Sequence, residues 1–382
     1  MHLAINAYFW NQPYVGSGQY TRNLVYYLNR LVSDLEITLI YPQTAEQPEP
    51  EAVPPSVHVK KVPVRPGQLG KVWFEQRQFP RACAEVGATV AHVPYWGAPL
   101  QSPIPLVVTI HDLTTLLVPE YRRGWKSRLY NALVTASARG ASHVITDSFA
   151  SKMNIIDHLG IEEKGVTAVY LAVGPEYNPK ADNSLMETAV RRKYDLPDLY
   201  VLYLGGYLLH KNVNTLLLAY SYVGQALGTD YPLLLAGRKP TRVSDIYPDY
   251  DDYIKALRIE KYVRWIGFVD EEDKPILYRS AETFVFPSRH EGFGLDVLEA
   301  LACGVPVVTT TADSLPEVIG DAGFAVDPDD ARAMAGAIIA TIMQDNLRVE
   351  LQEKAAKQAA RFSWEKTATE TLMIYDHVAS QR

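Results

Sequence analysis

Short apolar runs alternate with longer amphipathic stretches along the first half of the chain. Each run has about four to seven residues and is rich in Val, Ile and Thr, as buried parallel strands are. After a short strand at Met1–Asn6, the predicted strands are Leu35–Tyr41, Thr89–Val93, Pro105–Ile110, His143–Thr146 and Val166–Val169. The predicted helices are Gln19–Ser33, Gly70–Glu85, Trp125–Arg139 and Ala150–Leu159. This alternation predicts a parallel sheet with helices on both faces.

The same pattern restarts after a polar, Pro-containing stretch at Gly174–Asn183. The second series of predicted strands is Tyr200–Leu204, Leu233–Ala236, Val263–Ile266, Thr283–Phe286, Val307–Thr309 and Ala322–Val326. Its predicted helices are Asn212–Ala226, Asp249–Leu257, Glu272–Ser280, Leu295–Ala302, Leu315–Ile319 and Asp330–Gln344, with a last helix at Thr367–Val378. A chain of 382 residues exceeds the roughly 250–300 that one core fills, so two α/β domains are expected.

Charge is distributed unevenly between the two halves. The net charge is -7, yet residues 1–176 hold 15 Lys and Arg against 14 Asp and Glu, which leaves 22 against 30 for the remainder. Basic residues and aromatics gather in two stretches, Lys60–Arg81 and Arg122–Arg139. An acidic chain is a poor nucleic-acid binder. These stretches predict either solvated helix faces or contact with anionic lipid or a phosphorylated acceptor.

The two cysteines, Cys83 and Cys303, are far apart and in no metal-ligand spacing, which favours a reducing compartment over a disulfide framework. The first residues lack the basic start and long apolar run of a signal peptide. No segment reaches the roughly 18 consecutive apolar residues of a membrane span. We therefore expect a cytoplasmic protein and leave peripheral attachment to the inner face of a membrane open.

The strongest local pattern runs from Pro287 to Ala300, after a strand that ends at Phe286. Two glycines precede a helix that is predicted to begin near Leu295, so the backbone can approach a ligand and the helix N-terminus can face an anion. Glu291 lies in the loop, and Glu299 lies about one turn inside the helix, roughly 6 Å along the axis from the helix start. The pair predicts a polyol-binding site. The alternative is a capping acid and a solvated helix residue, although the neighbours of Glu299 are apolar.

This segment resembles the paired-glutamate motif of glycosyltransferase family 4, retaining enzymes of the GT-B fold. The resemblance extends over nearly the whole chain, and its motifs are specific in this order although each is weak alone. They are Gly16-x-Gly18, His111-Asp112, Thr146-Asp147-Ser148, Tyr203–Gly206 with Lys211-Asn212, Gly267-Phe268-Val269, Phe286–Ser288, Glu291–Gly294, Ala300–Val308 and Phe362–Trp364.

The resemblance implies two Rossmann-like, doubly wound parallel-sheet domains that face each other across a cleft. Residues 1–178 would form the acceptor domain and residues 179–361 the nucleotide-sugar domain. Residues 362–382 would form a C-terminal helix that crosses back to the first domain.

The resemblance also assigns roles in binding the donor. Glu299 would hold the ribose hydroxyls, Glu291 the donor sugar, and Lys211 the diphosphate, unless Lys211 is a surface lysine. Gly206 stands where the family often has an arginine, and Arg238, otherwise a surface loop residue, would replace that charge. The complete expected donor-binding set is Gly16, Gly18, Gly205, Gly206, Lys211, Arg238, Phe268, Glu291, Gly292, Phe293, Gly294, Leu295 and Glu299.

In the first half, Gly16-Ser17-Gly18 lacks the third glycine of a dinucleotide loop, so it predicts either a helix-start turn or a contact to the donor diphosphate. His111 follows a predicted strand and is either structural or, as the resemblance implies, catalytic together with Glu291 and Lys211. Asp112 is expected to be a local cap. Ser148 and Lys152 are expected to border the acceptor, with helix capping and solvation as equal alternatives.

No metal and no cofactor are expected. Asp249-x-Asp251 and Asp327-x-Asp329 have the spacing of a cation pair, but both lie in polar turns that favour solvated loops.

The resemblance implies transfer of a hexose from a nucleoside-diphosphate sugar to a hydroxyl of a glycan or lipid-linked acceptor, with retention of configuration. GDP-mannose is the first expectation, and UDP-glucose or UDP-N-acetylglucosamine comes next. The alternatives are an epimerase or phosphorylase of the same fold, or a catalytically silent nucleotide-binding partner.

Overall fold

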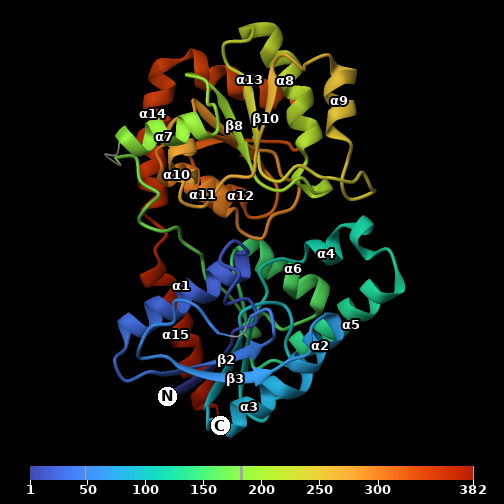
Figure 1. The fold of residues 1–382 in the computed structure, drawn as a ribbon, viewed down its shortest axis with the longest axis vertical. Coiled ribbons are helices and arrows are strands. Elements are labelled where there is room, and N and C mark those ends of the chain that lie inside the picture. The colour runs from blue at the N-terminus through green and yellow to red at the C-terminus, as the bar shows by residue number, and fades with distance from the viewer. Residues whose placement is uncertain (48, 181–183, 382) are drawn as a thin grey trace. The chain divides into compact units, whose positions relative to one another are not determined.

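The computed structural model describes residues 1–47, 49–180 and 184–381. It divides into two compact units, one formed by Met1–Leu171 with Ser363–Arg382 and the other by Ala172–Phe362. We call them unit 1 and unit 2 and describe each by itself (Figure 1). Residues 181–183 of the predicted boundary stretch, and the side chains of Trp125 and Lys126 in the second basic stretch, lie outside the described part.

Unit 1 contains a seven-stranded sheet in the order β3-β2-β1-β4-β5-β6-β7, and every pairing is parallel. The strands are β1 His2–Asn6, β2 Glu36–Gln43, β3 His58–Pro63, β4 Val90–Val93, β5 Leu106–Thr109, β6 His143–Thr146 and β7 Val166–Ala168. The helices are α1 Gly16–Leu31, α2 Gln68–Trp73, α3 Phe79–Glu85, α4 Thr114–Leu117, α5 Trp125–Arg139, α6 Phe149–Leu159 and α15 Trp364–Ser380. Shorter turns are η1 Phe74–Gln78, η2 Pro119–Arg122 and η3 Glu163–Gly165.

Unit 2 contains a six-stranded parallel sheet in the order β10-β9-β8-β11-β12-β13. Its strands are β8 Val201–Leu204, β9 Leu233–Ala236, β10 Val263–Gly267, β11 Thr283–Phe286, β12 Val307–Thr310 and β13 Gly323–Val326. Its helices are α7 Ser184–Lys193, α8 Val213–Leu227, α9 Tyr250–Leu257, α10 Lys274–Arg279, α11 Leu295–Ala302, α12 Leu315–Ile319, α13 Ala331–Met343 and α14 Asp345–Ala359, with the turn η4 Leu209–Lys211. Two doubly wound sheets confirm the predicted fold class.

Several elements differ from the sequence prediction, among them β3, α7, α14 and the helix predicted over Gly70–Glu85. Strand β3 was not predicted because it lies at the sheet edge, where its HVKKVP sequence keeps most side chains at least partly exposed. Helices α7 and α14 were not predicted because they are largely polar. The expected continuous helix Gly70–Glu85 is wrong: it is α2, then a π-helical turn, then α3.

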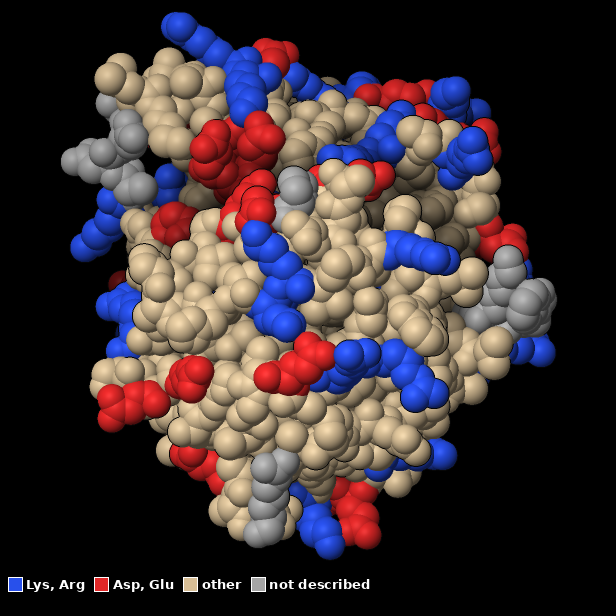
Figure 2. Space-filling view, turned by 60° about the horizontal axis from the view of Figure 1, so that its bottom comes forward, with Lys and Arg blue, Asp and Glu red and all other residues tan. Residues whose placement is uncertain are grey.

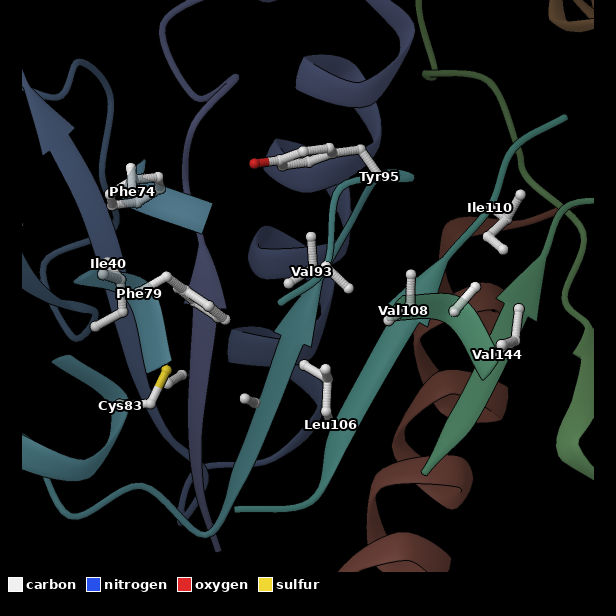
Figure 3. Close-up of a cluster of buried hydrophobic side chains, with 14 of the residues drawn as sticks. Ile40, Phe74, Phe79, Cys83, Val93, Tyr95, Leu106, Val108, Ile110 and Val144 are labelled. Atoms are coloured by element: carbon white, nitrogen blue, oxygen red, sulfur yellow. The ribbon is translucent and has the colours of Figure 1, made fainter. Parts of the chain in front are cut away.

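The core of unit 1 lies between its sheet and the helices α3 and α6, which bury Ile40, Phe79, Val108 and Ile155 completely. Figure 3 shows this cluster, with Phe74, Phe79 and Cys83 on one side of the strands that carry Val93 and Val108. Both cysteines are buried and free. Burial of these apolar side chains contributes about 25 cal/mol per Å² and fixes the positions of the strand ends.

Helix α15 completes unit 1, although it follows unit 2 in the sequence. The Trp364 ring stacks against Tyr27 of α1 at 6.3 Å between centroids, and the Tyr375 hydroxyl lies 2.6 Å from Nδ1 of the buried His92. Figure 1 shows α15, in red, beside the sheet of this unit.

The division between the units falls before Ala172, earlier than the sequence-based limit at residue 178. Tyr177 packs against Tyr278 of α10 at 6.3 Å between ring centroids, and Arg279 donates a hydrogen bond to the Asn178 carbonyl. These contacts attach the first residues after the last strand of unit 1 to unit 2.

Candidate functional site

The strand order of unit 2 reverses between β8 and β11. In open α/β sheets, ligands bind outside the carboxyl ends of the strands at such a switch point. Lys211 follows β8 and Glu291 follows β11, and Nζ of Lys211 lies 2.7 Å from Oε2 of Glu291. The two side chains remain 15% and 18% exposed, so solvent reaches the pair. Two residues that the sequence singled out separately therefore meet at the predicted ligand position.

The Glu291 loop is held by hydrogen bonds at both its side chain and its backbone. The Ser288 hydroxyl donates to Glu291 Oε2 at 3.2 Å, and the Glu291 N–H donates to Asp313 Oδ2 at 3.1 Å. The Ser314 hydroxyl is 2.9 Å from the carbonyl oxygens of both Glu291 and Phe293. Because Asp313 and Ser314 follow β12, the end of that strand fixes the backbone of the loop, while Lys211 after β8 and Ser288 after β11 hold the carboxylate.

Asn212 fixes the loop that carries Lys211. Its backbone is left-handed, with φ at 56°, and its amide donates to the carbonyls of Pro287 at 3.0 Å and Pro328 at 2.7 Å. The Lys211 ammonium lies 4.9 Å from the centroid of the Phe286 ring, a cation–π distance. The ammonium is therefore positioned by the end of β11 as well as by its own loop.

Helix α11 begins directly beside this pair. Gly294 has φ at +103°, and a Cβ there would lie 2.9 Å from Leu315 Cδ2, so only glycine fits this turn without strain. The Phe293 side chain is buried against Phe362, which leaves its backbone as the part that a ligand can use. Gly292, Gly294 and Leu295 continue the turn into a helix N-terminus, which favours an anion.

Glu299 is 5% exposed, so the alternative of a solvated helix residue is wrong. The Tyr278 hydroxyl donates to its Oε2 at 3.0 Å. Burial raises the pKa of Glu299 to about 7; the Lys274 ammonium opposes this shift and the Asp296 carboxylate adds to it. A buried carboxyl with a pKa near neutrality is characteristic of a functional site.

Three glycines line the ends of the adjacent strands β8 and β9. Gly205 and Gly237 have φ values of +156° and +123°, and a Cβ on Gly237 would lie 2.2 Å from the Gly205 oxygen. Gly206 has open space where its side chain would be. The Arg238 guanidinium stacks over the Phe268 ring at 4.8 Å, and that ring is 47% exposed. Arg238 therefore lies at the ends of β9 and β10, and its role as a replacement charge stays a prediction.

In unit 1, His111 follows β5 and lies between two hydrogen-bond acceptors. Its Nδ1 is 2.7 Å from Asp147 Oδ2, and its Nε2 is 3.2 Å from the Pro94 carbonyl. Burial lowers the pKa of His111, but the Asp147 carboxylate outweighs this effect, so the pKa is raised overall. The arrangement favours an imidazole with a proton on both nitrogens, set at the carboxyl ends of β4, β5 and β6.

The glycines of the first motif have different environments. A Cβ on Gly18 would lie 2.1 Å from the Gln12 oxygen, whereas Gly16 has no atom within 4 Å of that position. The Gly18 N–H donates to the Val15 carbonyl at 2.8 Å. Because the Gly18 N–H already donates to Val15, it is not the donor for a diphosphate. The absence of a side chain at Gly18 is the feature that would let a diphosphate approach the backbone.

The two residues expected at the acceptor have structural partners. Ser148 is fully buried and caps α6 by accepting the Ser151 N–H at 3.0 Å. Lys152 lies 3.5 Å from Glu163 and lines a hollow of about 530 Å³ with Thr167 and neighbouring residues. Their roles toward an acceptor stay predictions.

The remaining acids have local uses. Asp112 caps the turn before α4 by accepting the Thr114 N–H at 2.8 Å, as expected. Asp249 caps α9 and Asp251 pairs with Lys239 at 2.5 Å, while Asp329 pairs with Arg289. In the described ranges, no three His, Cys, Asp or Glu residues gather as metal ligands.

The surface is mixed in charge on the face that Figure 2 shows, where blue and red residues are scattered over a largely uncharged area. Within the described ranges, none of the helices has the length and apolar character that crossing a membrane requires. The prediction of a solvated basic face fails at Lys71 of the first basic stretch, because its ammonium points into a cluster of aromatic rings.

Sequence reasoning gave no role to several residues with a part in these sites: Asp147, Lys274, Tyr278, Asp296, Asp313 and Ser314. Asp147 directly follows β6, and Asp313 comes shortly after β12. Their position after the end of a strand is the sequence signal that could have identified them. Asp296 lies one residue after the start of α11. Nothing local distinguishes Lys274 from a solvated lysine.

Comparisons with known proteins show the family of the chain. Residues 14–177 match the family described as Glycosyltransferase Family 4, and residues 187–358 match Glycosyl transferases group 1. The chain is 34% identical over 275 residues to the O-antigen chain mannosyltransferase B of Escherichia coli, covering 70% of this chain and 69% of that protein.

Two further comparisons limit and support this result. The chain is 31% identical over 270 residues to the serotype-specific mannosyltransferase WbdA of Escherichia coli, which is 70% of this chain but only 32% of that protein. The sucrose-phosphate synthase of Thermosynechococcus elongatus has the same fold, with a TM-score of 0.77, 20% identity and complete coverage of both chains. The chain therefore belongs to glycosyltransferase family 4, with the GT-B fold, and is a glycosyltransferase of the mannosyltransferase-like kind.

Proposed function

We propose that this enzyme transfers mannose from GDP-mannose to a hydroxyl of a glycan or lipid-linked acceptor, with retention at the anomeric carbon. The observation that carries the proposal is the Lys211–Glu291 pair, which lies at the switch point of unit 2 beside the start of α11. An ammonium and a helix N-terminus suit a diphosphate, and a carboxylate suits sugar hydroxyls.

In this proposal, donor binding breaks the contact between Lys211 and Glu291, and each side chain binds a different part of the donor. The diphosphate accepts hydrogen bonds from Lys211 and from backbone N–H groups between Gly292 and Leu295, and sugar hydroxyls donate to Glu291 in place of the ammonium. The ribose hydroxyls donate to Glu299, whose charged form they stabilise. Each charged side chain exchanges one partner for another, so none is left buried and unpaired.

The reaction breaks the bond between the anomeric carbon and the diphosphate oxygen and forms one to the acceptor oxygen on the same face. The acceptor proton passes to the departing diphosphate, which serves as the base. Lys211 stabilises the charge that develops on the leaving group, which is where preorganised electrostatics contribute most. His111 of unit 1 contacts the donor sugar in this proposal, held in orientation by Asp147.

Mannose is favoured because two relatives are mannosyltransferases by name. The test is a panel of GDP-mannose, UDP-glucose and UDP-N-acetylglucosamine, monitored for released nucleotide with and without mannose-terminated glycans. We expect release from GDP-mannose that depends on the glycan. Turnover of any donor without an acceptor hydroxyl would instead indicate an epimerase, and turnover of a glycan with phosphate a phosphorylase.

We further propose that transfer needs no metal, because Lys211 and the α11 terminus supply the positive charge at the diphosphate. Rates measured with EDTA and with added Mg²⁺ are expected to agree within about twofold, because a hard cation with oxygen ligands has no part in this reaction. A strong loss of rate in EDTA would overturn this part of the proposal.

A lipid-linked acceptor would bring the enzyme to the inner face of a membrane. In support, Arg122, Arg128 and Arg139 line one hollow of about 370 Å³ in unit 1. Three guanidinium groups at one hollow suit a phosphate-bearing lipid or acceptor. Sedimentation with anionic vesicles, compared with neutral ones, is expected to recover more protein, and equal recovery would contradict membrane attachment.

A further inference from the structure

One Lys–Glu pair of unit 1 is formed by residues that have no part in the function proposed above. Nζ of Lys71, on α2, is 3.6 Å from Oε1 of Glu75, on the π-helical turn η1. The same ammonium lies over several aromatic rings. The centroid distances are 5.3 Å to Tyr8, 5.2 Å to Phe9, 5.3 Å to Tyr95 and 6.0 Å to Tyr130. We call these six residues, the ion pair together with the four rings around its ammonium, the caged pair.

The caged pair lies at the switch point of the unit 1 sheet. The strand order of this sheet reverses between β1 and β4. Tyr8 and Phe9 follow β1, and Tyr95 follows β4. Figure 3 shows Tyr95 just beyond the arrowhead of β4, at the end of the cluster where Phe74 also lies. The position is the one at which α/β sheets bind ligands, and the donor site of unit 2 occupies the corresponding place.

Two buried polar atoms in the caged pair are left unsatisfied. Glu75 is 1% exposed and Tyr95 is 4% exposed. The two side chains interact with each other and Glu75 Oε1 faces the Lys71 ammonium, but neither Glu75 Oε1 nor the Tyr95 hydroxyl makes a hydrogen bond of normal geometry within the described part of the chain. Burying a polar atom without a well-formed hydrogen bond is unfavourable. A Cβ on Gly97 would lie 2.4 Å from Tyr95 Cε2 and 2.7 Å from Glu75 Oε1, so glycine allows the chain to pack closely against both residues.

The structural explanation of the caged pair is weak. A buried ion pair contributes little to stability compared with apolar residues of the same volume. The π-helical turn that carries Glu75 is a rare element that occurs often at functional sites. Burial raises the pKa of Glu75 to about 7, and the Lys71 ammonium opposes that shift. The sequence therefore maintains a costly arrangement whose unsatisfied atoms are suited to a ligand.

The chemistry of the cluster selects the class of ligand. The Lys71 ammonium donates, Glu75 accepts, and their charges cancel. Tyr8, Phe9 and Tyr130 are only half-buried, so parts of their rings reach the surface. A sugar has hydroxyls that donate and accept at its edge and an apolar C–H face that packs on aromatic rings. An anionic ligand would need surplus positive charge, which a neutral pair does not provide.

We propose that the caged pair is the subsite for the neutral terminal sugar of the acceptor glycan, a proposal that rests on the transferase function proposed above. Glu75 and Tyr95 contact the sugar hydroxyls, and the half-buried rings contact its face.

The decisive variants are Tyr95→Phe and Glu75→Gln, with Glu85→Gln as the matched control. Tyr95→Phe removes a hydroxyl that is unsatisfied in the free protein, so a structural role predicts unchanged or higher stability and unchanged kinetics. Glu85 is on α3 of the same unit and pairs with Arg81 at 2.8 Å on the surface. Its substitution applies the same chemical change away from the cluster.

We expect Glu75→Gln to raise the acceptor KM about tenfold and Tyr95→Phe about fivefold at saturating donor, in line with the usual worth of polar contacts to a ligand. GDP affinity is expected to stay within about twofold, because unit 2 is unchanged, and Glu85→Gln is expected to match the wild type. If Glu75→Gln fails to fold, Tyr95→Phe decides alone. An unchanged acceptor KM in folded Tyr95→Phe and Glu75→Gln would overturn the proposal.

Direct titration separates this proposal from the transferase function. Mannose-terminated oligosaccharide is titrated into the wild type and into Tyr95→Phe without donor. Weaker binding by the variant supports the subsite even if no donor of the panel is turned over. Equal binding by both proteins, together with glycan-dependent release of nucleotide, overturns the subsite and leaves the transferase function intact.

Discussion

The two Lys–Glu pairs occupy matching places in their sheets but differ in environment. The Lys211–Glu291 contact is 2.7 Å long, is reached by solvent and is supported by Ser288. The Lys71–Glu75 contact is 3.6 Å long, with a carboxylate that is almost completely buried under aromatic rings. A short, partly hydrated pair can exchange partners with a charged ligand at low cost. A buried neutral pair suits an uncharged ligand that supplies hydrogen bonds without adding charge.

The largest effect is expected at the first pair. Lys211→Ala removes the ammonium that we propose stabilises the departing diphosphate, so kcat at saturating donor and acceptor should fall by about 10²–10³. Lys354→Ala, on the surface of α14, is the matched control and should retain full activity. A Lys211→Ala enzyme with normal kcat would remove the electrostatic basis of the comparison.

His111 and Asp147 form a third charged pair, which extends the comparison of the two Lys–Glu pairs. Asp147→Asn removes the carboxylate that raises the pKa of His111, so the pKa should fall and the neutral imidazole should dominate at lower pH. Loss of the fixed orientation should lower kcat by about 10- to 100-fold at about pH 7. A pH–rate profile measures this change: the limb due to His111 should move to lower pH, and an unmoved limb would contradict its role.

Replacing Lys71 and Glu75 together by apolar residues should leave the stability of the fold unchanged but weaken acceptor binding. Lys71→Met together with Glu75→Leu fills the same space with apolar atoms, so the free energy of unfolding should change by less than about 1 kcal/mol or increase. Acceptor KM should rise at least about tenfold. Denaturant unfolding and acceptor kinetics measure the two quantities. Large destabilisation with unchanged KM would mean that the pair is structural after all.

The smallest effect concerns pH and nucleotide affinity. The pKa of Glu299 is raised to about 7 in the free protein, and hydrogen bonds from ribose hydroxyls favour its ionised form. GDP should therefore bind about three- to tenfold more tightly at about pH 8 than at about pH 6. Calorimetric titration at both values tests this, and Glu299→Gln should remove the pH dependence attributable to this group.

Glu299 should also affect stability in a defined direction. Because its pKa is higher in the folded than in the unfolded protein, its favourable contribution is complete below about pH 4.5 and is lost as the pH rises through about 7. Thermal unfolding of the wild type between these values should show this decline, and Glu299→Gln should show less of it.

Local patterns were sufficient to locate the proposed donor site of unit 2. The strand that ends at Phe286, the glycine turn and the start of α11 at Leu295 are contiguous, so their geometry follows from neighbouring residues. The apolar neighbours of Glu299 also indicated burial correctly. The continuous helix predicted over Gly70–Glu85 failed because a π-helical turn adds a residue that the 3.6-residue period does not reveal.

The sequence by itself determined two parallel sheets, the glycine turn before α11 and the position of candidate residues after strands, because each depends on local periodicity and turn chemistry. Only the tertiary structure decided which of those residues meet. His111 pairs with Asp147, Lys211 with Glu291, and Tyr95 joins the caged pair because strand order places distant segments side by side. Burial then sets the pKa values and leaves polar atoms unsatisfied, and burial is a property of packing that no local pattern contains.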